Sequence, residues 1–450
     1  MNRRQFLGAL AATQAARAVN NKPNIVLLFG DDLGIADIGC YGGKEIPTPN
    51  IDSIARNGVR FTDGYVSCPY CSPTRAGLMT GRYQTRFGHE FNPGPAGQAS
   101  EDFGLPLTET TMAQRLKNLG YRTAMFGKWH LGYREKLRPH ERGFDEFYGF
   151  LGGAHSYLDA RADSNNPILD RDKEVDKVDY ATDEFGRRAA AFIDANKDRP
   201  FFLYVPFNAV HTPMEATGKY KDRFASIADD RRRTYAGMLS ALDDNVGLVL
   251  KALERNRLTG NTLVVFLTDN GGPTAANTSR NDPLRGFKAQ MWEGGIRVPF
   301  LMQWPGRIPK GKTFPHPVIA LDILPTAVAA AGGKPEADWK LDGVDLLPYV
   351  TGRSRNAPHE RLFWRFGAQW AVREGDWKLM SMGDGPAQLF HLRRDVGEST
   401  DLSAAEPARV ASMKAAWDGW NANNVPPRWG PPRRGDGEGK KKGGKKKKSA

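Results

Sequence analysis

Asn24-Ile25-Val26-Leu27-Leu28-Phe29-Gly30, followed at once by Asp31-Asp32, is the stretch that decides the fold. The run is almost entirely apolar and ends in glycine. This pattern is typical of a parallel strand that is buried on both faces. Two carboxylates directly after such a strand place charge at its carboxyl end, where open α/β sheets bind their ligands.

Segments with strand-like and helix-like patterns alternate around this run over roughly 300 residues. We expect helices at 50–58, 111–119, 181–196 and 235–255, and strands that begin at Arg60 or span 121–126, 200–205 and 262–268. The alternation predicts an α/β fold with one large, mostly parallel sheet sandwiched by helices, over residues 19–352.

The pattern changes after Gly352. Short strand-like runs at 361–365, 369–374, 377–380 and 388–392 are separated by turns, which favours an antiparallel sheet. A helix expected at 405–421 would pack across it. We therefore predict a smaller C-terminal α+β subdomain over residues 353–427, and a disordered Lys/Gly-rich tail over residues 428–450.

The net charge of +13 suggests a nucleic-acid binder, but its distribution argues against one. Residues 428–450 carry a net +8 and residues 1–18 a net +3, which leaves the body of the chain nearly neutral. Because the charge lies at the two ends, we expect no nucleic-acid partner. With 450 residues, 40% of them hydrophobic, the chain can bury a large core.

The N-terminus has the pattern of an export signal. Asn2-Arg3-Arg4-Gln5-Phe6-Leu7-Gly8 resembles a twin-arginine motif, and Ala16-Arg17-Ala18 fits a small-x-small cleavage site. We expect a signal peptide over residues 1–18, the twin-arginine export machinery as a partner, and a periplasmic or secreted protein. No apolar run approaches the roughly 18 residues that a transmembrane helix needs.

Polar residues follow four of the expected strands, and one site at the carboxyl edge of the sheet would collect them. Asp31, Asp32, Asp269 and Asn270 all offer oxygen ligands, which suit a hard cation. The set favours Ca²⁺ and leaves Mg²⁺ open.

Other side chains at the same edge carry positive charge or titrate near neutrality. Arg75, Lys128 and Lys288 are cations that suit an oxyanion in transit, which points to sulfuryl or phosphoryl transfer. His130 and His211 are candidates for proton transfer.

Cys71-Ser72-Pro73-Thr74-Arg75 places a permanent cation one helical turn from a thiol, so we expect Arg75 to lower the pKa of Cys71. Alone, these five residues equally suit an ordinary turn before a helix. Followed by Ala76 to Arg82 and Tyr83, they resemble the signature of the type I sulfatases, as in arylsulfatases and N-acetylgalactosamine-6-sulfatases. The three cysteines leave open whether Cys40 and Cys68 pair.

The resemblance extends from about Lys22 to Leu402 and implies an alkaline phosphatase-like fold. It implies that a formylglycine-generating enzyme oxidises Cys71 to Cα-formylglycine, whose hydrate is the nucleophile. By the same resemblance, formylglycine-71 joins the metal ligands Asp31, Asp32, Asp269 and Asn270.

The resemblance also implies roles for the remaining polar residues of the site. Arg75 and Lys128 would stabilise the hydrate, while Lys128, His211 and Lys288 would bind the sulfate oxygens. His211 or Lys288 would protonate the leaving alcohol, and His130 would take the proton from the second hydroxyl.

The predicted function is hydrolysis of sulfate monoesters on sulfated polysaccharide or glycosaminoglycan fragments. Two alternatives stay open: a phosphonate or phosphodiester hydrolase of the same superfamily, and a catalytically silent binder of sulfated glycans. We expect the loops 152–170 and 273–283 to set specificity. Candidate residues for a sugar subsite are Phe147, Tyr148, His155, Tyr157 and Arg161.

Overall fold

The protein is described here from a computed structural model that covers residues 22–95, 97, 100, 103–383 and 385–430. The expected signal peptide at 1–18 and most of the basic tail lie outside these residues. Within the described residues, no helix is both long enough and apolar enough to cross a membrane.

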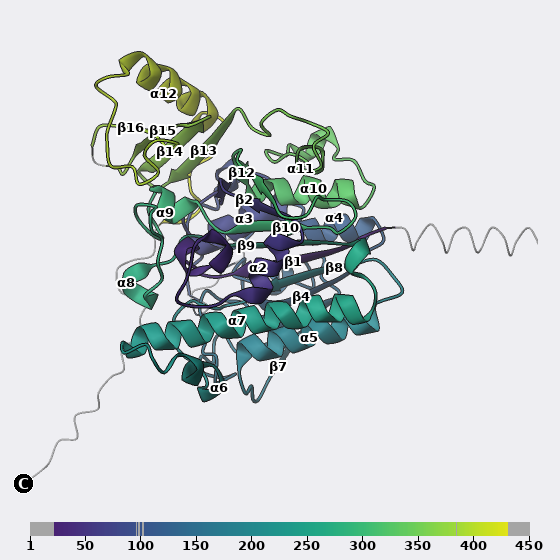
Figure 1. The fold of residues 1–450 in the computed structure, drawn as a ribbon. Helices are drawn as coiled ribbons and strands as arrows, with labels where there is room; N and C mark the ends of the chain where they lie inside the picture. The colour runs from purple at the N-terminus through teal and green to yellow at the C-terminus, as the bar shows by residue number, and fades with distance from the viewer. Residues whose placement is uncertain (1–21, 96, 98–99, 101–102, 384, 431–450) are drawn as a thin grey trace, which may run out of the picture.

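A ten-stranded mixed sheet forms the centre of the molecule (Figure 1). Its strands, in spatial order, are β11 (Lys312–Phe314), β2 (Val59–Phe61), β10 (Phe300–Gln303), β9 (Thr262–Thr268), β1 (Asn24–Gly30), β8 (Phe201–Pro206), β4 (Arg122–Lys128), β5 (Glu146–Phe150), β6 (Leu169–Asp170) and β7 (Lys173–Glu174). The five strands from β9 to β5 are parallel, with β1 paired to β9 and β8. Every residue of β1 is buried, as its apolar sequence predicts.

Helices cover both faces of this sheet (Figure 1). Side chains of α2, α5 and α7 pack on one face, and those of α3, α4 and α10 pack on the other. The helices are α2 (Pro49–Arg56), α3 (Cys71–Thr80), α4 (Met112–Asn118), α5 (Ala181–Ala195), α6 (Gly218–Lys221), α7 (Asp230–Arg255), α8 (Thr274–Asn277), α9 (Glu293–Ile296), α10 (Ile323–Ala330), α11 (Leu347–Val350) and α12 (Pro407–Asn421).

Local signals fix where several helices begin and end. The Thr111 hydroxyl accepts from the Gln114 N–H and the Gln114 side chain accepts from the Thr111 N–H, a capping box that starts α4. Asp229 caps α7, which therefore begins five residues before the predicted Tyr235. The α3 helix ends at Gly81, whose φ of 66° suits glycine.

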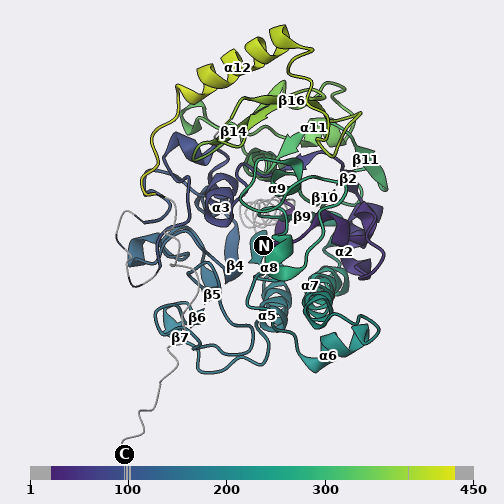
Figure 2. The ribbon, with the colours of Figure 1, turned by 90° about the vertical axis from the view of Figure 1, so that its left-hand side faces the viewer.

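A four-stranded antiparallel sheet lies at one end of the molecule, with α12 across it (Figure 2). It consists of β13 (Arg361–Phe366), β14 (Gln369–Glu374), β15 (Trp377–Ser381) and β16 (Gln388–His391). A two-stranded sheet of β3 (Gly64–Tyr65) and β12 (Val318–Ile319) lies beside it and shares its core. The predicted fold class is confirmed, while the domain boundaries at 19–352 and 353–427 stay predictions.

Two sequence-based expectations need correction here. Phe147 and Tyr148, proposed for a sugar subsite, belong to β5, a strand that the sequence analysis missed, and both are buried in the core. Trp429 falls in the segment predicted to be disordered. Its indole donates to the Phe91 carbonyl at 3.0 Å and packs edge-on against His89, so the packed chain extends at least to this residue.

Candidate functional site

The carboxyl ends of the central strands bring most of the predicted site residues together. Asp31 and Asp32 follow β1, Lys128 ends β4, and Asp269 and Asn270 follow β9. Cys71 is the first residue of α3. Ligand atoms of Asp31, Asp32, Cys71 and His211 all lie within 4.8 Å of one another. One compact polar cluster therefore forms where the sequence predicts a site.

The Cys71 thiol is buried inside this cluster. Its Sγ lies 3.9 Å from Asp31 Oδ1, and the residue is 1% exposed. Burial raises the pKa of the thiol to about 12, although Lys128 and Lys288 oppose the shift. The expectation that Arg75 lowers this pKa is therefore wrong, because the cost of burying a thiolate outweighs the attraction of the cations. An unmodified Cys71 is a neutral thiol at pH 7.

Arg75 instead ties the carboxylates together. Its Nη2 donates to Asp269 Oδ2 at 2.8 Å and lies 3.3 Å from Asp31 Oδ2. Its Nη1 donates to the Lys128 carbonyl at 3.1 Å. Because the guanidinium is wholly buried, these contacts offset the cost of removing its charge from water.

Two lysines pair with the aspartates that follow β1. Lys128 donates to Asp31, and Lys288 Nζ donates to Asp32 Oδ1 at 2.7 Å. Burial alone would raise the pKa of Asp31 and of Asp32, but these lysines and His211 outweigh it and lower both. The three predicted carboxylates therefore face one guanidinium and two ammonium groups, and their formal charges cancel without a ligand.

The two candidate histidines lie at the rim and in the wall of the cluster. His211 Nε2 is 3.5 Å from Asp32 Oδ2, and its Nδ1 lies 2.6 Å from the Thr212 carbonyl. Burial lowers the pKa of His211, with Asp32 opposing the shift. Burial, together with Lys128 and Arg75, holds the pKa of His130 well below its usual range. Both rings therefore favour the neutral form, which can accept a proton.

His130 is held by its backbone. The Ser72 hydroxyl donates to the His130 carbonyl at 2.6 Å, and His89 Nε2 lies 2.6 Å from the same hydroxyl. The φ angle of His130 is 59°, in the left-handed region that non-glycine residues rarely adopt. Sequence reasoning missed Ser72 and His89, since no motif links residue 89 to residue 130.

The donor set fits a hard cation. Asn270 Nδ2 donates to Asp32 Oδ1 at 2.7 Å and to the Gly271 carbonyl at 3.1 Å, while its buried Oδ1 has no hydrogen-bond partner. An unpartnered buried acceptor beside three carboxylates is costly unless a cation or water meets it. Asp31, Asp32, Asp269 and Asn270 therefore suit Ca²⁺ or Mg²⁺ better than Zn²⁺.

The residues proposed for a sugar subsite do not form one. Tyr157 is fully buried, and its hydroxyl bonds to the carbonyls of Asn208 at 2.6 Å and His211 at 2.8 Å. It supports the turn that carries His211. His155 is 4% exposed and packs on Phe150, while Arg161 is exposed and pairs with Asp176.

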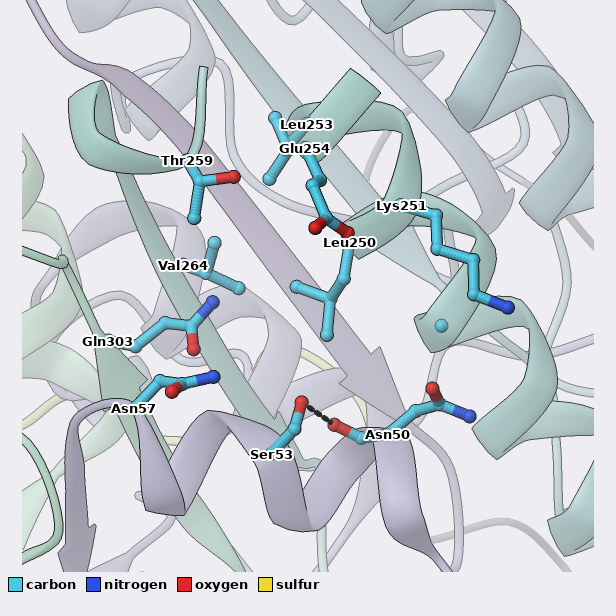
Figure 3. Close-up of a pocket in the computed structure, with 11 residues that line it drawn as sticks. Asn50, Ser53, Asn57, Leu250, Lys251, Leu253, Glu254, Thr259, Val264 and Gln303 are labelled. Atoms are coloured by element: carbon cyan, nitrogen blue, oxygen red, sulfur yellow. Dashed lines mark hydrogen bonds between the residues drawn. The ribbon is translucent and has the colours of Figure 1, made fainter. Parts of the chain in front are cut away.

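The three cysteines are free thiols, so Cys40 and Cys68 do not pair. A separate hollow of about 500 Å³ lies between α2, the C-terminal half of α7 and β10 (Figure 3). Asn57, Thr259 and Gln303 are among the residues that line it. None of the predicted site residues does, so it is not part of the cluster.

Comparison with known proteins gives consistent matches. The family model described as Sulfatase matches residues 23–333. Arylsulfatase J of Mus musculus is 32% identical, over 93% of this chain and 79% of that protein. N-acetylgalactosamine-6-sulfatase of Sus scrofa is 33% identical, over 87% and 84%. The crystal structure of Ps i-CgsB in complex with k-i-k-neocarrahexaose superposes with a TM-score of 0.86 at 38% identity, over 91% of this chain and 94% of that one.

Proposed function

This chain belongs to the sulfatase family and is a sulfuric ester hydrolase, and from that premise we propose that it removes sulfate from fragments of sulfated polysaccharide. The single observation that carries the proposal is the cluster itself. One buried cysteine lies at the carboxyl edge of the sheet. The groups around it are three carboxylates, an amide, two lysines, an arginine and a histidine.

Similarity to Ps i-CgsB, whose structure holds neocarrahexaose, supports an oligosaccharide substrate. We propose sulfated oligosaccharides of the neocarra type as the first class to test. The expected export signal fits such a substrate, because polysaccharides are degraded outside the cytoplasm. The proposal includes the twin-arginine machinery as a partner and a periplasmic or secreted location.

The nucleophile in this proposal is residue 71. Burial keeps the thiol protonated and therefore a weak nucleophile, which favours a modified side chain at this position. Oxidation of Cys71 to formylglycine by a formylglycine-generating enzyme would supply a hydrated aldehyde in its place. At the start of α3, its side chain lies 3.9 Å from Asp31 Oδ1, and Lys128 and Lys288 act on it electrostatically.

A divalent cation would be held by Asp31, Asp32, Asp269, Asn270 and the modified residue 71. Bound there, the cation would supply Lewis-acid polarisation of a sulfate oxygen. It would also compete with Lys128 and Lys288 for the aspartates. The two ammonium groups would then be available to hold the sulfate group of the substrate.

Three side chains orient the sulfate ester in this mechanism. Lys128, His211 and Lys288 bind its oxygens and offset the charge that develops during transfer, the usual source of most of the rate gain. His211 is 16% exposed and Lys288 is 12% exposed, so both can reach a substrate that enters from solvent. Arg75 fixes the carboxylates and, with Lys128, stabilises the reactive form of residue 71.

Residues at the rim and in the wall of the cluster transfer protons in this mechanism. His211 or Lys288 protonates the departing alcohol: the Lys288 ammonium already carries the proton, whereas the His211 ring, neutral at rest, must first gain one. His130, whose depressed pKa keeps the ring neutral, accepts the proton that must leave residue 71 when sulfate is released.

The test is a comparison of substrates with protein made beside a formylglycine-generating enzyme. Release of inorganic sulfate from an aryl sulfate and from neocarra-oligosaccharides is measured against cleavage of an aryl phosphonate. The proposal predicts that the sulfate esters are the better substrates. Faster phosphonate cleavage would point to the hydrolase alternative. Binding of the oligosaccharide with no turnover would point to a silent binder.

A further inference from the structure

The turn that carries Lys288 is held by the C-terminal sheet. Gln369, the first residue of β14, donates from Nε2 to the Ala289 carbonyl at 3.0 Å. The Met291 N–H donates to Gln369 Oε1 at 3.2 Å. A single amide thus pairs with two backbone groups just after Lys288, as a strand would, although 80 positions separate it from Ala289.

The same turn is held from the catalytic side. The Ala289 N–H donates to the Pro69 carbonyl at 2.8 Å, two residues before Cys71. Ala289 has a φ of 67°, a conformation that alanine adopts only when its surroundings impose it. The backbone that aims Lys288 is therefore clamped between the entry to α3 and the first residue of β14.

A second anchor lies slightly further along the chain. Lys378 on β15 donates to the Met291 carbonyl at 2.7 Å and pairs with Glu293 at 2.9 Å and Glu398 at 2.8 Å. The Glu293 N–H donates to Glu398 Oε2 at 2.7 Å. All three charged side chains are 0% exposed. This anchor fixes the end of the segment and leaves Gln369 to set the turn.

We propose that Gln369 is a positioning residue that aims Lys288 at the sulfate group. The Lys288 ammonium pairs with Asp32, one of the proposed cation ligands, so its partner changes when cation and substrate bind. A lysine that must change partners cannot rely on the ion pair for its place. The backbone clamp provides that place in both states, and the small sheet thereby becomes part of the active site.

This inference rests on the sulfate-binding role proposed for Lys288. Gln369→Met keeps the length and apolar bulk of the side chain and removes both hydrogen bonds. Gln388→Met is the matched control, because Gln388 lies on β16 of the same sheet and its amide faces Asp401. Lys288→Met and the double variant Lys288→Met/Gln369→Met complete the set.

Each variant is assayed for kcat/KM on an aryl sulfate, for inhibition by inorganic sulfate, and for its melting temperature. We expect Gln369→Met to lower kcat/KM by about 10- to 100-fold, since a small misplacement of a binding group costs that much. Sulfate inhibition should weaken in parallel, while Gln388→Met keeps near-native values in both assays.

The double variant separates positioning from general damage. If Gln369 acts through Lys288, its loss adds little once Lys288 is gone, in either assay. An equal loss in both backgrounds, or a Gln369→Met enzyme with native kcat/KM, would overturn the inference. Native activity in Lys288→Met would instead overturn the role proposed for Lys288, so the two failures are distinguishable. For any variant too slow to assay, the rise in melting temperature on addition of inorganic sulfate reports sulfate binding in place of inhibition.

Discussion

Two of the buried charge clusters among the described residues resemble each other in composition and differ in what they leave unsatisfied. At the carboxyl edge of the large sheet, Asp31, Asp32 and Asp269 face Arg75 and two lysines. At the junction with the small sheet, Glu293 and Glu398 face Lys378, while Arg373 and Arg297 pair with Asp63 close by.

The two clusters differ in how far solvent reaches them and in whether a polar atom is left without any partner. The Lys378 ammonium lies within 2.9 Å of three oxygens and is wholly buried, so solvent does not reach it. The site cluster keeps an unpartnered amide oxygen on Asn270 and two partly exposed groups, His211 and Lys288. We infer that the charges at the junction serve the fold, whereas those at the proposed site can accept a ligand.

The largest effect that this comparison predicts is at Cys71. Cys71→Ala should lower kcat/KM by at least about a thousandfold, because it removes the nucleophile while leaving the charges in place. The measurement is sulfate release under saturating and limiting substrate. Cys68→Ala is the matched control, since Cys68 is equally buried just before the helix. Comparable activity in the two variants would contradict the proposed chemistry.

Loss of the lysine should have a different effect in each of the two clusters. Lys378→Met leaves two buried carboxylates without their cation and should cost about 3–5 kcal/mol of unfolding free energy. Lys288→Met should instead lower kcat/KM by about 10²- to 10³-fold, the usual cost of losing one group that stabilises transferred charge. Urea unfolding and steady-state rates on both variants check this. Reversed outcomes would mean that the two clusters have been assigned the wrong way round.

Removal of metal should affect the proposed site and leave the junction cluster unchanged. A chelator should abolish turnover, and Ca²⁺ or Mg²⁺ should restore it. Saturating cation should also raise the unfolding free energy, by about 2.7 kcal/mol at a hundred times its Kd. Melting curves should show this gain in Lys378→Met and a smaller gain in Asn270→Ala. An equal gain in both would remove Asn270 from the proposed ligand set.

The smallest predicted effect concerns a buried pair outside both clusters. His359 Nε2 lies 2.8 Å from Asp322 Oδ1, and Asp322 also accepts from the N–H groups of Ile319 and Val344. Burial alone would lower the pKa of His359, but Asp322 outweighs it and raises the pKa.

The sign of the pH dependence follows from this shift. Because folding raises the pKa of His359, its pairing with Asp322 stabilises the protein. This stabilisation is complete below the unfolded pKa of about 6.5 and is lost as the pH rises through the folded pKa. His359→Asn should therefore cost about 1–2 kcal/mol at low pH and less at alkaline pH. Urea unfolding of both proteins, at low and at alkaline pH, measures this difference in unfolding free energy. A cost that grows with pH would contradict the pairing.

Apolar runs predicted the central strands well because strands buried on both faces leave little choice of residue. The same rule failed at β5 and at β10, neither of which the sequence analysis predicted. Phe147 and Tyr148 were assigned to a sugar subsite, since aromatic side chains suit both a core and a ligand, and a five-residue strand carries no periodic signal.

Strand ends also predicted which polar residues would lie together, because parallel strands deliver their carboxyl ends to one edge. The sequence alone could not predict the pKa values inside the cluster. The Arg75 charge was visible, but the depth of Cys71, which decides its pKa, depends on packing from several segments. Gln369 gave no signal at all, since its two bonds join parts of the chain that no motif connects.

Peptide mass spectrometry across Cys71 shows whether residue 71 becomes the modified nucleophile. The protein is made in the presence of a formylglycine-generating enzyme, digested, and compared with protein made without it. We predict that the peptide containing residue 71 carries the mass of the aldehyde only in the first sample, and that sulfate release follows the modified fraction. An unmodified thiol in a preparation that still releases sulfate would contradict the account.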